Sequence, residues 1–332
     1  MSVPSSSPIS TGYSRRLGLF DATMLVIGGI IGAGIFLNPA VVAQRVPTVS
    51  VAIGAWITGG VVALAGALCF AELAARRPLA GGGYVYLRDA FGPLPAFLYG
   101  WTQLLVINSG GIAAVAFTFA TYAVALGGGN ARLATPVAIG AVLLLSGINY
   151  FGIRLGAIVQ NIFTVLKITA LAGLIAVGLL RGMAAPPTAP AGPTGPIGIT
   201  AALGAALVPV LFAYGGWQST NFVAEEIRDT ERTLPRALLL GVAGVVAIYV
   251  LANVVYLGVL GLSGLAASTA PAFDVMERLA GPVGSTSITI GVVVSTFGFL
   301  NLAILASPRM YHAMAADGVF FGAAARLDPR YH

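Results

Sequence analysis

One ionisable side chain lies in the middle of a long apolar stretch. Lys167 is near the centre of GAIVQNIFTVLKITALAGLIAVGLL, and it is the only lysine in the chain. A charge at the centre of a bilayer costs about 2.5–3.5 kcal/mol on insertion scales, so such residues are usually functional and paired inside the protein. No carboxylate lies at similar depth in another apolar stretch. We therefore expect backbone carbonyls, those of the first apolar stretch above all, to be its partners.

Two roles are open for this lysine. It either braces the first stretch as a fixed cation, or it takes part in proton coupling, because removal from water favours the neutral amine. The sequence does not choose between them.

Glycines cluster at the middle of two apolar stretches. They are Gly28, Gly29, Gly32 and Gly34 in the first stretch, and Gly215 and Gly216 in the sixth. Glycine lowers helix stability by about 1 kcal/mol relative to alanine and lets the backbone unwind. Unwinding inside a membrane frees N–H and C=O groups, which is tolerated only where they line a cavity or meet a ligand. Helix N-termini attract an anion and freed carbonyls a cation, so a zwitterion fits such a site.

Two other interpretations of the glycines were weighed. Gly28 and Gly32 have the GxxxG spacing that packs membrane helices closely. A dinucleotide fingerprint fails, because the three residues after Gly34 are apolar and the third glycine is missing. Two clusters at matching positions of two stretches favour a binding site over packing.

Aromatic and polar residues near the clusters are further candidates. The aromatic ones are Phe36, Phe212, Tyr214 and Trp217, and the polar ones in the eighth apolar stretch are Ser295, Thr296 and Asn301. Each set either contacts a ligand or only packs helices, and both alternatives stay open.

The elements that position these residues are membrane helices. The chain is 58% hydrophobic and 8% charged, whereas soluble domains are about 25% charged. Spanning a bilayer takes about 20 residues, and such uniformly apolar runs are helices rather than barrel strands. Eight runs qualify, near 20–43, 49–74, 93–124, 133–151, 155–180, 199–223, 236–262 and 284–306.

Charge placement predicts the orientation. The net charge is +6, and the basic residues are scattered between apolar runs, which favours a membrane protein over a nucleic-acid partner. With a cytoplasmic N-terminus, twelve arginines fall inside and four outside. We therefore expect a plasma-membrane protein with a disordered cytoplasmic tail at 1–16 and an external Pro-rich loop at 181–198. One cysteine and two histidines predict no disulfide framework, metal site or cofactor.

Two loops on the expected cytoplasmic side carry charge. RRPLAGGGYVYLRDAFG (76–92) predicts a short interfacial helix, and it is no phosphate loop because Lys-Ser/Thr does not follow its glycines. EEIRDTERTLPRA (225–237) mixes acids and bases, and we expect a helix to end before Pro235. Its charges form either a salt-bridged lock between helices or a solvated face.

Taken together, several segments resemble the amino acid–polyamine–organocation superfamily, in particular its bacterial permeases and L-amino-acid transporter branch. The matching segments are GGIIGAGIF (28–36), FAELAARRPLAGGGYVYLRDAFG (70–92), VQNIFTVLKI (159–168), FAYGGWQSTNFVAEEIRDTERTLPRA (212–237) and SPRMYHAMAADG (307–318). The resemblance implies an all-α LeuT-type fold of two inverted five-helix repeats, with helices 1 and 6 broken.

The resemblance also implies a site. Carboxylate contacts would fall on the N–H groups of Gly32, Ala33 and Gly34, and amine contacts on the carbonyls of Ile30, Phe212 and Gly215. Trp217 is the candidate cover. Lys167 matches the lysine that replaces a sodium ion in sodium-independent members, which favours proton symport or exchange. No acidic residue is among the inward candidates, so a neutral amino acid is the expected substrate.

Three other expectations follow. Relatives of this kind usually have twelve spans, whereas this chain stops after the eighth, so we expect a transporter domain at 17–306, a cytoplasmic loop at 307–332 and a fragment. A polyamine or cationic amino acid antiporter, and an amino acid binding or sensing protein without transport, are the alternatives. An enzyme is not expected, because the spans lack a convergent set of acids, bases or metal ligands.

Overall fold

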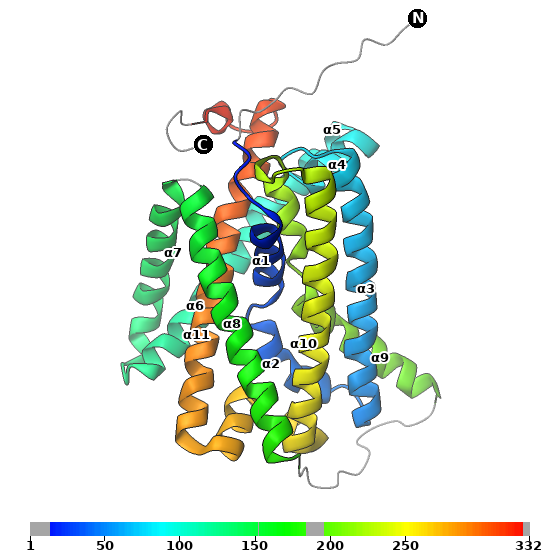
Figure 1. Cartoon of the computed structure of the whole chain (residues 1–332), viewed down its shortest axis with the longest axis vertical. Coiled ribbons are helices and arrows are strands. Elements are labelled where there is room, and N and C mark those ends of the chain that lie inside the picture. The colour runs from blue at the N-terminus through cyan, green and yellow to red at the C-terminus, as the bar shows by residue number, and fades with distance from the viewer. Residues whose placement is uncertain (1–13, 152, 184–195, 328–332) are drawn as a thin grey trace, which may run out of the picture.

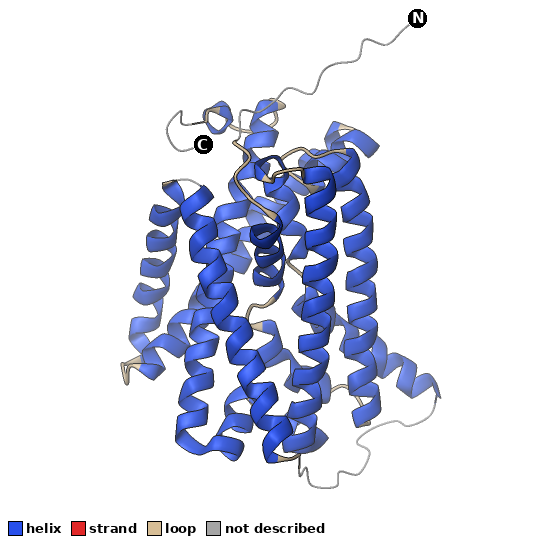
Figure 2. Ribbon diagram, in the orientation of Figure 1, coloured by secondary structure: helices blue, strands red, loops and turns tan. Residues whose placement is uncertain are grey.

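The computed structural model describes residues 14–151, 153–183 and 196–327. Most of the predicted tail at 1–16 and of the predicted loop at 181–198 lies outside these residues. The described chain is helical throughout, apart from loops and one isolated parallel bridge between Leu17 and Ile227 (Figure 2). The prediction of an all-α fold is therefore confirmed.

The helices form one bundle with most axes roughly along its length (Figure 1). The α-helices are α1 Leu19–Ile30, α2 Gly34–Ala43, α3 Val49–Arg76, α4 Gly83–Phe91, α5 Pro93–Thr102, α6 Ser109–Leu126, α7 Ala134–Tyr150, α8 Ile153–Arg181, α9 Pro196–Tyr214, α10 Thr230–Ala267 and α11 Pro271–Ala316, and the other turns are η1 Gln103–Asn108, η2 Ala131–Leu133, η3 Trp217–Glu226 and η4 Gly322–Ala325. Within the described residues seven segments are long and apolar enough to span a membrane, and the bent pair α1–α2 makes an eighth. These correspond to the eight predicted runs.

Two boundaries differ from the prediction. The last span was expected to end at 306, with a loop from 307, but α11 continues to Ala316 because Met310 and Met314 keep packing into the bundle. Pro235 was expected to follow the end of a helix. That interpretation is wrong, because the polar residues before it form the first turn of α10, which begins at Thr230.

Ion pairs gather at one end of the bundle, where α4 and the C-terminal end of α11 lie (Figure 1). The predicted interfacial helix is α4, and its Arg88 bonds Asp317 at 2.6 Å. Burial, then the hydrogen bond that its hydroxyl donates to Asp317 and the charge of that carboxylate, raise the pKa of Tyr84. This helix is therefore tied to the chain that follows α11.

Candidate functional site

The first predicted break is present between α1 and α2. The α-helix ends at Ile30, resumes at Gly34, and bends by 40° between them. Ile31 is extended, with ψ of 90°. The glycine cluster therefore interrupts the first span as the sequence indicated.

The second predicted break separates α9 from η3. Gly216 has φ of 108°, a conformation that side-chain-bearing residues rarely adopt. The two breaks touch each other, because a Cβ on Gly29 would lie 2.8 Å from the Gly216 carbonyl oxygen, and one on Gly216 would overlap the Gly29 carbonyl. Glycine at both positions lets the two interrupted backbones meet.

The first break releases five carbonyls from their i+4 amides, those of residues 28–32. Lys167 of α8 donates from Nζ to the carbonyl oxygens of Gly28 at 3.0 Å and Ile31 at 2.6 Å. Lys167 is fully buried. The prediction that its partners are carbonyls of the first span is confirmed.

Two further helices complete this capping. Ser295 of α11 donates from its hydroxyl to the carbonyls of Ile31 and Gly32, both at 3.2 Å. Tyr249 of α10 donates to the Ile30 carbonyl at 3.0 Å. Four of the five released carbonyls therefore accept a hydrogen bond from a side chain of another helix. Sequence reasoning selected Lys167 and Ser295 but missed Tyr249.

Most of the N–H groups at the same break lack an acceptor within the described residues. Gly32 N–H donates to the Ile30 carbonyl at 2.9 Å, but the N–H groups of Ala33, Gly34 and Ile35 donate to no acceptor within the described residues. They open α2, where the helix dipole is positive. Free donors beside capped acceptors make this a place for an anion such as a carboxylate.

The predicted amine-binding carbonyls have different surroundings. Ile30 O already accepts two hydrogen bonds, and Phe212 O accepts one from Gly215 N–H at 3.2 Å. Gly215 O and Gly29 O accept none within the described part of the chain. These two carbonyls, one from each break, therefore keep their lone pairs free of hydrogen bonds within the described residues.

The side chains of Phe212 and Trp217 do not together cover the main-chain groups of the two breaks. Phe212 is 77% exposed and points away from the bundle, whereas Trp217 packs edge-on against Phe70, with ring centroids 5.1 Å apart. Trp217 stays a candidate cover, while only the main chain of Phe212 lies at the break.

Glycines let other helices pack closely against the face of α8 that carries Lys167. A Cβ on Gly28 would overlap Gln160 Nε2 and lie 2.6 Å from Thr164 Oγ1, and one on Gly298 would lie 3.4 Å from Lys167 Nζ. Gln160 and Thr164 share the Lys167 face of α8, and Thr164 donates to the Met24 carbonyl at 3.2 Å. This buried polar face of α8 holds α1 in place.

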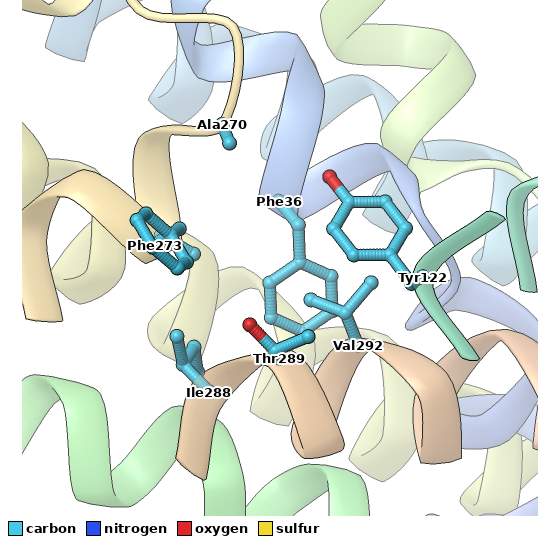
Figure 3. A pocket seen from close by; sticks show the side chains of 8 residues that line it. Phe36, Tyr122, Ala270, Phe273, Ile288, Thr289 and Val292 are labelled. Carbon is cyan, nitrogen blue, oxygen red and sulfur yellow. The ribbon is translucent and has the colours of Figure 1, made fainter. Parts of the chain in front are cut away.

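A pocket adjoins the break on the α2 side (Figure 3). Its cavity volume is about 10 Å³, which is room for about one water molecule in this conformation. Its lining residues are Phe36, Tyr122, Ala270, Ala272, Phe273, Ile288, Thr289 and Val292. Thr289 and Tyr122 bring its only hydroxyls, and none of these eight side chains is charged. The pocket suits an uncharged group.

The part of the first span that follows the break, α2, is hydrogen-bonded to α9 of the sixth span. Pro209 lacks an N–H, so the Ala205 carbonyl has no i+4 donor, and Arg45 fills that position at 2.7 Å. Asn38 donates to the Pro209 carbonyl at 2.8 Å. The segments that follow the first break and precede the second are therefore linked by side chains of α2 and the turn after it.

The predicted salt-bridged lock is present at the charged end of the bundle. Glu226, 1% exposed, pairs with Arg309 of α11 at 2.8 Å. The Glu226 carbonyl also accepts the N–H groups of Arg16 and Leu17, both at 2.9 Å. The segment before α1, the end of η3 and α11 thus meet at one residue.

The described residues are all-α and form eight membrane-length segments when the bent pair α1–α2 is taken as one, and the breaks in two of these segments touch each other. These features define an integral membrane protein of the broken-helix class. The sequence profile of the family described as amino acid permease matches residues 17–331. The chain belongs to the amino acid permease family.

Relatives support this assignment. The chain is 34% identical to the human b(0,+)-type amino acid transporter 1 over 96% of its own length and 66% of that protein. It is 35% identical to the serine/threonine exchanger SteT of Bacillus subtilis, over 92% and 69%, and 34% identical to the mouse large neutral amino acids transporter small subunit 2, over 95% and 60%. The chain therefore spans about two thirds of the length of these relatives.

Proposed function

We propose that this chain binds an amino acid between its two helix breaks and carries it across the plasma membrane by alternating access. The observation that carries the proposal is the set of three unpaired amides at the start of α2, beside carbonyls that other helices cap. These amides suit a carboxylate, and the Gly215 and Gly29 carbonyls suit an ammonium group.

The proposed substrate is a neutral amino acid. The adjoining pocket has no charged lining residue, and the nearest buried charge, Lys167, is cationic and occupied by main-chain carbonyls. A cationic side chain would meet no carboxylate there. The name of the mouse relative, which specifies large neutral amino acids, agrees with this choice.

The proposed mode is exchange or proton-coupled symport, with the N-terminus in the cytoplasm. Lys167 Nζ occupies the position beside the carbonyls of the first break at which a free cation would otherwise bind. The Bacillus relative is named an exchanger, which favours exchange. Binding without flux is the second candidate function, because the unpaired amides and capped carbonyls of the first break support ligand binding by themselves.

Uptake into proteoliposomes tests the proposal. The chain is reconstituted, and entry of labelled L-leucine, L-serine and L-arginine is measured with and without internal unlabelled amino acid, and with an imposed proton gradient. Saturable entry of leucine or serine, but not arginine, is expected. Binding of an amino acid without entry would indicate the second function, and neither binding nor entry would refute both.

A further inference from the structure

A chain of buried polar side chains runs from α11 to α1, next to the first break. Asn301 of α11 is fully buried and donates from Nδ2 to the Gly156 carbonyl and to Gln160 Oε1, both at 3.1 Å. Gln160 of α8 is also fully buried and donates from Nε2 to Thr164 Oγ1 at 3.3 Å. The Thr164 hydroxyl donates to the Met24 carbonyl of α1 at 3.2 Å. Asn301 is thereby connected to α1 through two side chains of α8.

The order of donors and acceptors in this chain is determined by its main-chain ends. A main-chain carbonyl accepts hydrogen bonds and cannot donate them, so Asn301 must turn its NH2 group toward the Gly156 carbonyl. The same NH2 group faces Gln160, which must present its oxygen there and its own NH2 group to Thr164. The Thr164 hydroxyl therefore accepts from Gln160, and its single proton is left for the Met24 carbonyl. The orientation of Asn301 thus determines where the proton of Thr164 points.

A second amide holds Asn301 from the opposite side. Asn149 of α7 donates from Nδ2 to Asn301 Oδ1 and to the Leu145 carbonyl, both at 2.9 Å. Because the Leu145 carbonyl can only accept, it fixes the NH2 end of Asn149. An Asn301 amide turned the other way would place its NH2 group against that of Asn149 and its oxygen against the Gly156 carbonyl. The orientation of Asn301 is therefore fixed by groups on both α7 and α8.

The chain ends where a glycine lets α1 pack closely on α8. A Cβ on Gly28 would overlap Gln160 Nε2, so the main chain of α1 packs directly on the Gln160 amide. Met24 lies one turn before Gly28, whose carbonyl accepts from Lys167 at 3.0 Å. A reversed Gln160 amide would offer its oxygen to the Thr164 hydroxyl, which would then donate to Gln160 instead of Met24. Reversal would therefore remove one hydrogen bond between α8 and α1 at the turn before the break.

We propose that Asn301 is a positioning residue for α1, acting through the Gln160 amide to direct the Thr164 hydroxyl to the Met24 carbonyl. The inference goes beyond the proposed function, because it concerns the docking of α1 on α8 and involves no substrate contact. Packing of α11 on α8 would need the volume of the Asn301 side chain but not its donors. From α11, Asn301 thereby controls how readily α1 separates from α8.

Amide hydrogen exchange of α1, Leu19–Ile30, read by mass spectrometry on the purified chain, tests the inference. Asn301→Leu and Thr164→Val keep side chains of similar size and remove their hydrogen-bonding groups. Each is expected to speed exchange of α1 about three- to tenfold, the equivalent of one lost hydrogen bond. Thr164→Ser keeps the hydroxyl and should stay within about twofold of the wild type. Thr296→Val is the control that should leave α1 unchanged, because Thr296 is fully buried on α11 and bonds only within that helix.

The double variant separates positioning from packing. In the Thr164→Val background, Asn301→Leu should speed α1 exchange by less than about twofold more, because no hydroxyl remains to be directed. A larger further increase, or unchanged α1 exchange in Asn301→Leu alone, would overturn the inference. Gln160→Met breaks the same connection without altering α11, and it replaces Asn301→Leu in this comparison if that variant does not fold. Wild-type exchange of α1 in Gln160→Met would equally contradict the inference, whatever the chain transports.

Discussion

Replacing Lys167 by methionine tests how the first break is kept open. The change keeps the length of the side chain and removes its charge and donors. The Gly28 carbonyl then loses the only side-chain donor found for it, while the Ile31 carbonyl keeps Ser295 at 3.2 Å. The carbonyls of Gly28 and Ile31 become available to the amides of Gly32 and Ile35, as in a continuous helix.

The stability change of Lys167→Met is the balance of two opposing contributions. Two charge-assisted hydrogen bonds are lost, each contributing about 1.5–3 kcal/mol. Against this, the charge no longer has to be placed at mid-membrane depth, which recovers about 2.5–3.5 kcal/mol. The balance lies between a stabilisation of about 0.5 kcal/mol and a destabilisation of about 3.5 kcal/mol. Lys167→Met should therefore fold but carry a rewound break.

Uptake by proteoliposomes and thermal unfolding of the purified chain form the assay. We expect Lys167→Met to remain monodisperse and to lose at least about tenfold in uptake, through weaker carboxylate binding. Thr169→Val is the control, because Thr169 is exposed on the same helix and bonds only within it. Wild-type uptake by Lys167→Met would refute the bracing argument. Loss of uptake driven by a proton gradient with exchange retained would assign Lys167 to coupling instead.

Two other substitutions probe the break directly. Gly28→Ala places a methyl group against Gln160 and should lower the thermal midpoint by the equivalent of about 1–3 kcal/mol. The control Gly173→Ala, which has open space around it, should raise the midpoint slightly. Equal shifts in the two variants would contradict the close packing of α1 on α8. Ala33→Pro deletes one unpaired amide at a residue whose φ of −77° already suits proline. Equilibrium binding of L-leucine should weaken about tenfold, with Ala33→Ser unchanged, and an unaltered affinity in Ala33→Pro would exclude that amide from the site.

Much of the site could be predicted from the sequence because its residues are anomalous for a membrane span. Glycines at the middle of two spans lower helix stability, and Lys167 raises the free energy of membrane insertion. These residues can therefore be identified as unusual from the sequence alone. The break positions, the all-α fold and the carbonyl partners of Lys167 follow from that. The sequence does not predict which carbonyl oxygen of the break each buried side-chain donor reaches.

Tyr249 shows why the rest could not be predicted. It sits among apolar residues of α10, as Tyr256 does, and both are fully buried aromatic residues with a hydroxyl. Only the packing of α10 against α1 gives one hydroxyl a carbonyl and leaves the other without a partner. The same limit applies to Phe212, for which the sequence left open whether the side chain contacts a ligand or only packs against helices, and which is 77% exposed.

The main-chain groups of the first break determine the charge it prefers. A broken helix offers both carbonyls and amides, so by itself it favours neither an anion nor a cation. Among the described residues, α8, α10 and α11 supply donors to four of the five released carbonyls, and no acceptor is supplied to the amides of Ala33, Gly34 and Ile35. The proposed anion site therefore uses main-chain amides, while the side chain of Lys167 is engaged with carbonyls. Because the three capping side chains lie on three different helices, a displacement of α1 relative to any of them changes which main-chain groups are free, and this links ligand affinity to the arrangement of the bundle.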